Sequence, residues 1–322
     1  MNILVPLNDF EAVRAYIIGG AKEFYIGFYD EIWEEKFGKY SDMNRMSGYG
    51  KEANRYSFEE MIAFIEPIHE MGGKLFVTFN TSSYSDEQIL FLQPYLNVLH
   101  EKRVDGVIVA CPELLKTSSE IGLTGVVSTI AGIYNADTAR FYKELGAKRI
   151  IIPRDVSMED MREMIGENPD IEYEVFMMRS GCRYSDSHCL GLHTADLCAF
   201  CTSLDQAKKT YHIAESRVEN PDKIRERAMK TTEIFQDRFH NHVCGMCAIY
   251  DFVELGVAAG KVVGRTHETE EILKDIALIS QNIEIAKCCT CKEEYLEEMF
   301  FPDDRDDRCD NGLSCYYPEV RF

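Results

Sequence analysis

The stretch GVVSTIAGIYNADTARFYKELGAKRIIIPRDVSMEDMREMI, residues 125–165, repeats one pattern twice. A β-branched run over Gly125–Ser128 precedes a helical pattern over Ala136–Leu145, and a second run over Arg149–Ile152 precedes another over Met158–Ile165. Short apolar runs bounded by turn residues are typical of buried strands, and apolar residues at helical spacing indicate helices. The stretch therefore predicts two consecutive β–α units, the building block of a parallel sheet.

The same order extends along the chain in both directions. Further strands are predicted at Asn2–Val5, Glu23–Gly27, Lys74–Asn80, Gly106–Ala110, Tyr173–Met177 and Lys261–Val263. Further helices are predicted at Asp9–Gly19, Phe58–Met71, Asp86–Glu101, Ala248–Leu255 and Glu268–Ile279. Repeated β–α units of this number favour an α/β fold closed into a TIM-like (β/α)8 barrel, with an open doubly wound sheet as the alternative.

The predicted barrel occupies residues 1–285. A cysteine-rich insertion at about residues 178–247 separates the seventh and eighth strands, and a cysteine-rich C-terminal tail follows at residues 286–322. In a barrel, the insertion begins at the C-terminal ends of the strands, where this fold places its chemistry.

Composition limits the class of protein and its partners. The 322 residues are 45% hydrophobic and 28% charged, and no apolar run approaches the length of a membrane helix. No signal peptide is visible at the start, so we expect a cytoplasmic protein. Thirty-five basic against 55 acidic residues give a net charge of −20, which disfavours a nucleic acid and favours a small molecule or a protein as partner.

Cysteine spacing indicates a metal site. Six of the twelve cysteines form the pairs Cys182 and Cys189, Cys198 and Cys201, and Cys244 and Cys247. Disulfides are disfavoured in a reducing compartment, and sets of thiolates suit zinc or an iron–sulfur cluster. Nearby histidines also allow a mixed zinc site: His188, His193, His240 and His242. Five later cysteines predict a second metal centre, with a solvated tail as the alternative: Cys288, Cys289, Cys291, Cys309 and Cys315.

Polar side chains follow the predicted strands at their C-terminal ends. We predict that they bind substrate: Asn80, Ser128, Arg154, Arg179, Lys261 and Arg265. Arginines could hold a carboxylate with two hydrogen bonds, although salt bridges to the abundant acidic residues are the alternative. Glu174 lies on the seventh strand, and if it points into the barrel it is the candidate catalytic acid or base.

Several segments together resemble peptidase family U32, the collagenase-like group. They are PLNDFEAVRAYIIGGAKEFYIGF, KLFVTFNT, VSTIAGIYNADTARFYKELGAKRIIIPRDVSMEDM, YEVFMMRSGCRYSDSHC and GVAAGKVVGR, and they span roughly residues 1–285 in the family's order. The resemblance implies a barrel and a [4Fe–4S] cluster on four thiolates. Cys182 and Cys189 match the first two ligands. The third falls at Cys198 or Cys201 and the fourth at Cys244 or Cys247, of which Cys247 aligns more naturally.

The family contains proteins described as peptidases and others that hydroxylate RNA bases or the ubiquinone ring without molecular oxygen. This sequence has no GxSxG elbow, HExxH helix or papain-type cysteine motif. We therefore predict an iron–sulfur enzyme for oxygen-independent redox or hydroxylation chemistry on a small molecule, carboxylates among the candidates, with a related U32-type protein as partner. A collagenase-like peptidase, an RNA-base hydroxylation protein and a non-catalytic iron–sulfur subunit are the alternatives.

Overall fold

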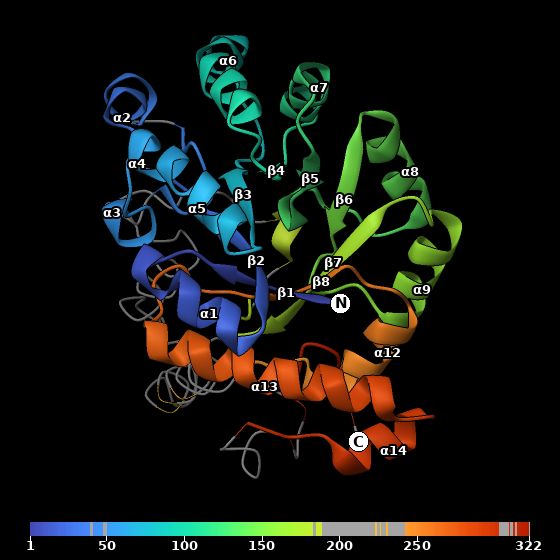
Figure 1. The fold of residues 1–322 in the computed structure, drawn as a ribbon. Coiled ribbons are helices and arrows are strands. Elements are labelled where there is room, and N and C mark those ends of the chain that lie inside the picture. The colour runs from blue at the N-terminus through green and yellow to red at the C-terminus, as the bar shows by residue number, and fades with distance from the viewer. Residues whose placement is uncertain are drawn as a thin grey trace.

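Eight parallel strands close into a barrel in the computed structural model, each pairing with the next and β8 with β1 (Figure 1). The strands are β1 Asn2–Pro6, β2 Ala21–Ile26, β3 Lys74–Phe79, β4 Gly106–Val109, β5 Gly125–Val127, β6 Ala147–Ile151, β7 Glu172–Met178 and β8 Ala259–Val262. The structure describes residues 1–38, 41–47, 50–182, 185–188, 223, 226, 230, 242–302, 309, 312 and 314–321. The predicted TIM-like barrel is confirmed, and the open doubly wound sheet is excluded.

Helices form an outer ring around the strands (Figure 1). In chain order they are α1 Val13–Gly19, α2 Glu31–Phe37, α3 Gly50–Ala53, α4 Phe58–Ala63, α5 Ile65–Glu70, α6 Asp86–Glu101, α7 Pro112–Ile121, α8 Ala136–Glu144, α9 Met158–Glu167, α12 Ile249–Glu254, α13 Thr269–Cys288 and α14 Lys292–Glu298. Side-chain caps fix several starts: Ser57 with Glu60 and Ser85 with Gln88 form capping boxes at α4 and α6.

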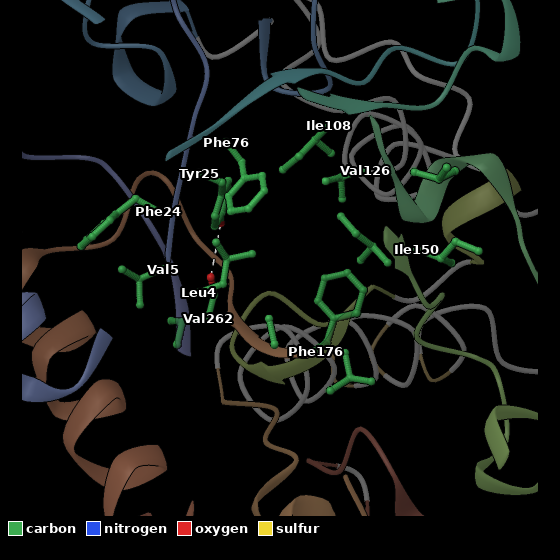
Figure 2. Packing of buried hydrophobic residues seen from close by; sticks show 14 of the residues in the cluster. Leu4, Val5, Phe24, Tyr25, Phe76, Ile108, Val126, Ile150, Phe176 and Val262 are labelled. Atoms are coloured by element: carbon green, nitrogen blue, oxygen red, sulfur yellow. Dashed lines mark hydrogen bonds between the residues drawn. The ribbon is translucent and has the colours of Figure 1, made fainter. Parts of the chain in front are cut away.

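The core of the barrel comes from strand residues that are nearly all buried. Tyr25, Phe76 and Phe176 contribute large rings from β2, β3 and β7 (Figure 2). The Tyr25 hydroxyl donates to the Val262 carbonyl oxygen at 3.3 Å, the dashed line in Figure 2. Strands buried on both faces explain why the sequence shows continuous apolar runs rather than alternation.

One predicted helix is divided. Residues 58–71 form α4 and α5, which meet at Phe64, where the backbone N–H bonds to the Met61 carbonyl three residues back. Pro67 lies one turn later and has no N–H to donate to the carbonyl of Ala63. The proline therefore interrupts the helical ladder at this point.

The C-terminal segment returns to the end of β7. Cys244 bridges Met178 on one side and Cys315 on the other. The Tyr317 hydroxyl donates to the Phe176 carbonyl at 2.9 Å, and the Tyr316 hydroxyl bonds to the Arg179 carbonyl. Most of the predicted insertion lies outside the described residues. Among the residues that the structure describes, no helix is both long and apolar enough to cross a membrane.

Candidate active site and metal centre

Charged side chains cross the interior of the barrel. Arg149 on β6 pairs with Glu23 on β2, and these strands are not neighbours, so the pair must span the lumen. Their side chains are 4% and 0% exposed. Lys261 on β8 lies 2.9 Å from the carboxylate of Glu174 on β7 and 4.1 Å from the centre of the Tyr25 ring. Glu174 therefore points inward, the orientation that its predicted catalytic role requires; the role itself stays a prediction.

A buried carboxylate organises the C-terminal mouth of the barrel. Asp186, in the short 3-10 helix η4 Asp186–His188, pairs with Arg154 and, at 3.0 Å, with Arg45. It also accepts a hydrogen bond from the Thr129 hydroxyl at 3.0 Å. Burial alone would raise the pKa of Asp186, but the two guanidinium groups hold it below its ordinary value. Asp186 is thus an ionised anchor that fixes two arginines at the mouth.

Arg265, just after β8, has a different environment. Its side chain donates to Asn54 Oδ1 at 2.8 Å, to Asn44 Oδ1 at 3.1 Å and to Thr78 Oγ1 at 3.5 Å. These acceptors are neutral, and no carboxylate of the described residues pairs with Arg265, which is 6% exposed. Burial lowers its pKa to about 10. A buried cation with only neutral partners is costly, and it is a strong receptor for an anionic oxygen.

Gly27 at the end of β2 makes room for this guanidinium. A Cβ added at Gly27 would lie 2.2 Å from Arg265 Nη1 and 2.3 Å from Asn54 Oδ1. Any larger residue would therefore displace the arginine from the mouth. The β2 backbone approaches Arg265 closely because this position has no side chain.

Most of the predicted substrate-binding residues meet at this mouth. Asn80 accepts a hydrogen bond from the Arg45 backbone N–H at 3.0 Å and lies 3.4 Å from the Ser128 hydroxyl. Arg45 and Arg154 share the carboxylate of Asp186 here, and Arg265 bonds to neutral acceptors. Among these contacts of the described residues, guanidinium groups outnumber carboxylates, although the whole chain is strongly acidic.

Arg179 and Lys261 differ from this group. Arg179 pairs with Asp275 and Glu271 on α13, with Nη2–Oδ1 and Nη1–Oε1 distances of 3.1 Å each. Its backbone φ is 63°, and that of Ser180 is 54°, so the chain leaves β7 through two left-handed residues. Lys261 is buried inside the barrel, where its ammonium group pairs with the Glu174 carboxylate. Burial lowers the pKa of Lys261; the Glu174 carboxylate opposes this shift in part, and the charges of Arg265 and Arg154 add to it.

The predicted metal ligands are only partly within the described residues. Cys182 is half-buried and close enough to Arg154 and Tyr316 to influence the pKa of both. Cys189, Cys198 and Cys201 lie outside the described residues, as do His193 and His240. Cys244, Cys247, Cys309 and Cys315 line one recess, and the other late cysteines do not join them there. In the described part of the chain, no three His, Cys, Asp or Glu side chains already stand where they could hold a metal ion.

Sequence analysis missed several residues of the mouth. Asn44, Arg45 and Asn54 come from the part of the β2–β3 connection that precedes the predicted helix, where the sequence predicts no element. Asp186 lies between Cys182 and Cys189, and its position inside that cysteine pair was the available signal. The connections that carry these residues come together only when the barrel closes.

Comparison with known proteins identifies the family. The model of peptidase family U32 matches residues 8–301. The chain belongs to peptidase family U32.

Relatives of this U32 chain include proteins named for tRNA hydroxylation and a collagenase. It is 27% identical to the tRNA hydroxylation protein P1 of Bacillus subtilis, over 58% of this chain and 41% of that protein. It is 24% identical to the tRNA hydroxylation protein P2 of the same organism, over 91% of this chain and 88% of that protein. A collagenase of Porphyromonas gingivalis is 24% identical over 50% of this chain and 34% of its own length. The match thus covers less than half of the P1 and collagenase chains.

Proposed function

We propose that this U32 protein is an iron–sulfur enzyme that hydroxylates a small molecule bearing a carboxylate or another anionic oxygen, without molecular oxygen. The observation that carries the proposal is Arg265. It is buried at the mouth and held by neutral acceptors, and no described carboxylate neutralises it. A substrate carboxylate would supply the missing negative charge and gain two parallel hydrogen bonds from the guanidinium.

The residues around the mouth would give this substrate its orientation. Asn44 and Asn54 hold the Arg265 fork, while Asp186 holds Arg45 and Arg154 beside it. These arginines are recessed, with side chains 19% and 10% exposed for Arg45 and Arg154. Such an arrangement suits one anionic group that enters the mouth, rather than an extended polyanion that lies across it.

Cys182 supports a cluster at the same mouth. Its thiol lies close enough to the Arg154 guanidinium for the two groups to interact electrostatically. Cys182 would be one of four thiolate ligands, together with Cys189 and two of the remaining paired cysteines. When bound, a [4Fe–4S] cluster supplies one-electron transfer or, with an open iron, a Lewis acid; zinc is the alternative metal.

The protein's own groups would manage protons and water. Lys261 and Glu174 form a buried ion pair beside Arg265. The Glu174 carboxylate would be the acceptor for one proton released at the mouth, and solvent would take the other. Adding a hydroxyl from water to a C–H bond releases two protons and two electrons. We propose that an external electron-transfer protein accepts the electrons, while the related U32-type partner stays a separate prediction.

Anaerobic purification tests the cofactor, and ligand binding tests the site. Iron and acid-labile sulfide in equal amounts are expected, whereas zinc without iron would overturn the cluster. In thermal shift assays with a panel of small mono- and dicarboxylates, we expect stabilisation of the wild type that is lost in Arg265→Gln. Arg140→Gln, on the exposed face of α8, is the matched control and should respond like the wild type. Failure of every carboxylate to stabilise the wild type would refute the substrate class.

RNA-base hydroxylation is the second candidate, because several relatives are named for tRNA hydroxylation and one is named a 23S rRNA 5-hydroxycytidine C2501 synthase. The mouth would then receive a single nucleotide. Mass spectrometry of nucleosides from tRNA and rRNA of a strain that lacks this protein decides between the two: loss of a hydroxylated nucleoside favours RNA.

Proteolysis by a lone reactive cysteine, Cys111 just after β4, is disfavoured. Cys111 is 1% exposed, and its thiol donates to Glu113 at 3.2 Å. Burial raises its pKa, the reverse of the activation that a nucleophilic thiol needs. Gelatin cleavage by purified protein would nevertheless restore the peptidase alternative.

A further inference from the structure

Four cysteines from two distant parts of the chain line one recess near the end of β7. Cys244 and Cys247 come from the segment before α12, and Cys309 and Cys315 from the C-terminal tail. The sequence groups Cys309 and Cys315 with the other late cysteines, but tertiary structure places them opposite Cys244 and Cys247 instead.

The first pair has the local form of a metal-binding turn. Cys247 lies in the 3-10 helix η7 Met246–Ala248, and the Met246 backbone N–H donates to the Cys244 sulfur. A Cβ at Gly245 would lie 2.9 Å from the Tyr317 ring and 3.2 Å from the Phe176 carbonyl, so the turn packs tightly against its support. Cys-x2-Cys turns of this kind point two sulfurs into the same space, as in structural zinc sites.

Side chains from α14 hold this turn in place. Lys292 Nζ bonds to the Cys247 carbonyl and lies 2.6 Å from Asp251 Oδ2, and the Tyr295 hydroxyl donates to the Met246 carbonyl at 2.6 Å. The backbone of the first pair is therefore fixed before any metal binds, which lowers the entropy cost of binding.

The tail brings the second pair to the first through backbone hydrogen bonds. The Cys244 N–H donates to the Ser314 carbonyl at 3.0 Å, and the Tyr316 N–H donates to the Cys244 carbonyl at 2.9 Å. Between the two tail cysteines the chain turns at Gly312, whose φ is 72°. Arg321 lies on the recess as well, and its guanidinium would partly balance the charge of several thiolates.

We propose that Cys244, Cys247, Cys309 and Cys315 hold a second metal centre with four thiolate ligands, which ties the C-terminal tail to the barrel. Four sulfurs around one zinc ion at about 2.3 Å lie about 3.8 Å apart. The described thiols do not yet have such an arrangement, so the side chains must turn inward on binding. Zinc and an iron–sulfur cluster share this ligand chemistry, and the experiment distinguishes them.

This centre is separate from the proposed catalytic cluster. Cys247, Cys309 and Cys315 are the thiols close enough to Cys244 to influence its pKa, whereas Cys182 influences Arg154 and Tyr316 at the mouth. The family resemblance places the fourth ligand of the catalytic cluster at Cys244 or Cys247. If both bind in the recess, that cluster would instead take Cys198 and Cys201 together with Cys182 and Cys189. The exposed Cys288 and Cys291 have no place in either set.

Metal analysis of anaerobically purified full-length variants tests the proposal. The double variant Cys309→Ala/Cys315→Ala should lose one metal centre per chain relative to the wild type, and the control Cys288→Ala/Cys291→Ala should lose none. Loss of zinc identifies a zinc site, and loss of iron with sulfide identifies a cluster. Unchanged zinc, iron and sulfide in the double variant would overturn the proposal.

Two further variants serve as controls. Cys315→His separates loss of the recess metal from misfolding, and Cys182→Ala separates the recess metal from the proposed catalytic cluster. Cys315→His should retain zinc, since histidine replaces cysteine in zinc sites, and X-ray absorption should then show one nitrogen ligand in place of one sulfur. Cys182→Ala should lose the catalytic cluster and keep the recess metal. If Cys182→Ala loses nothing while the double variant loses one centre, the proposed function fails and the recess site stands.

Discussion

Two arginines at the same mouth should respond in opposite ways to the same substitution. Arg265→Met removes a buried cation whose pKa has fallen from 12.5 to about 10. At about 1.4 kcal/mol per pKa unit, that fall corresponds to a burial cost of about 3–4 kcal/mol, which the substitution relieves. Arg265 has two good hydrogen bonds, at 2.8 and 3.1 Å, whose loss costs about 2 kcal/mol together.

The acceptors left behind keep other donors. Asn44 Oδ1 also accepts from the Met46 N–H at 3.0 Å, and Asn54 Oδ1 from Asn44 Nδ2 at 3.3 Å. We therefore expect the free energy of unfolding of Arg265→Met to remain within about 1 kcal/mol of the wild type, or to rise. Stabilisation by carboxylates should disappear in the same variant, because the receptor is gone.

Arg154→Met is the matched comparison. It removes one of the two guanidinium partners of the buried Asp186, and loss of a partner from a buried pair costs about 3 kcal/mol or more. With a urea m-value of about 3 kcal/mol/M, the unfolding midpoint should fall by about 1 M. Urea unfolding followed by circular dichroism measures both variants. Equal destabilisation of Arg265→Met and Arg154→Met would refute the view that Arg265 is an uncompensated charge.

Three other substitutions test the rest of the site and its support. Arg149→Met should cost about 3–5 kcal/mol in urea unfolding, because Glu23 is left buried, while the exposed Arg140→Ala should cost less than about 1 kcal/mol. Asp186 has a pKa below its ordinary 3.8 in the folded state, so its contribution to stability is present above about pH 3.8 and is lost as pH falls below that value. Asp186→Asn should accordingly flatten the acid side of the stability profile, and an unchanged profile would count against the ionised anchor. Gly27→Ala should displace Arg265 and weaken carboxylate binding at least tenfold by calorimetry; wild-type affinity would show that the guanidinium does not bind the ligand.

Local pattern was sufficient for the barrel. The two strands within residues 125–165 and the other six strands are short apolar runs, which can be recognised from neighbouring residues alone. The repeated β–α order then restricts the topology to very few folds. Phe58–Met71 was predicted as one helix, because its apolar spacing continues across Pro67, and the missing N–H decided the break. Helix α13 continues beyond Ile279 to Cys288, since no glycine or proline interrupts it.

The sequence by itself determined the order of strands and helices, the cysteine pairs and the positions of Arg154 and Arg265 at strand ends. These features depend on spacing along one segment. Tertiary structure alone decided that Arg154 meets Asp186 while Arg265 meets only neutral acceptors, and that Cys309 and Cys315 lie opposite Cys244 and Cys247. Such contacts join segments far apart in sequence, so their charge balance and ligand sets exist only after the barrel has closed and the tail has folded back onto it.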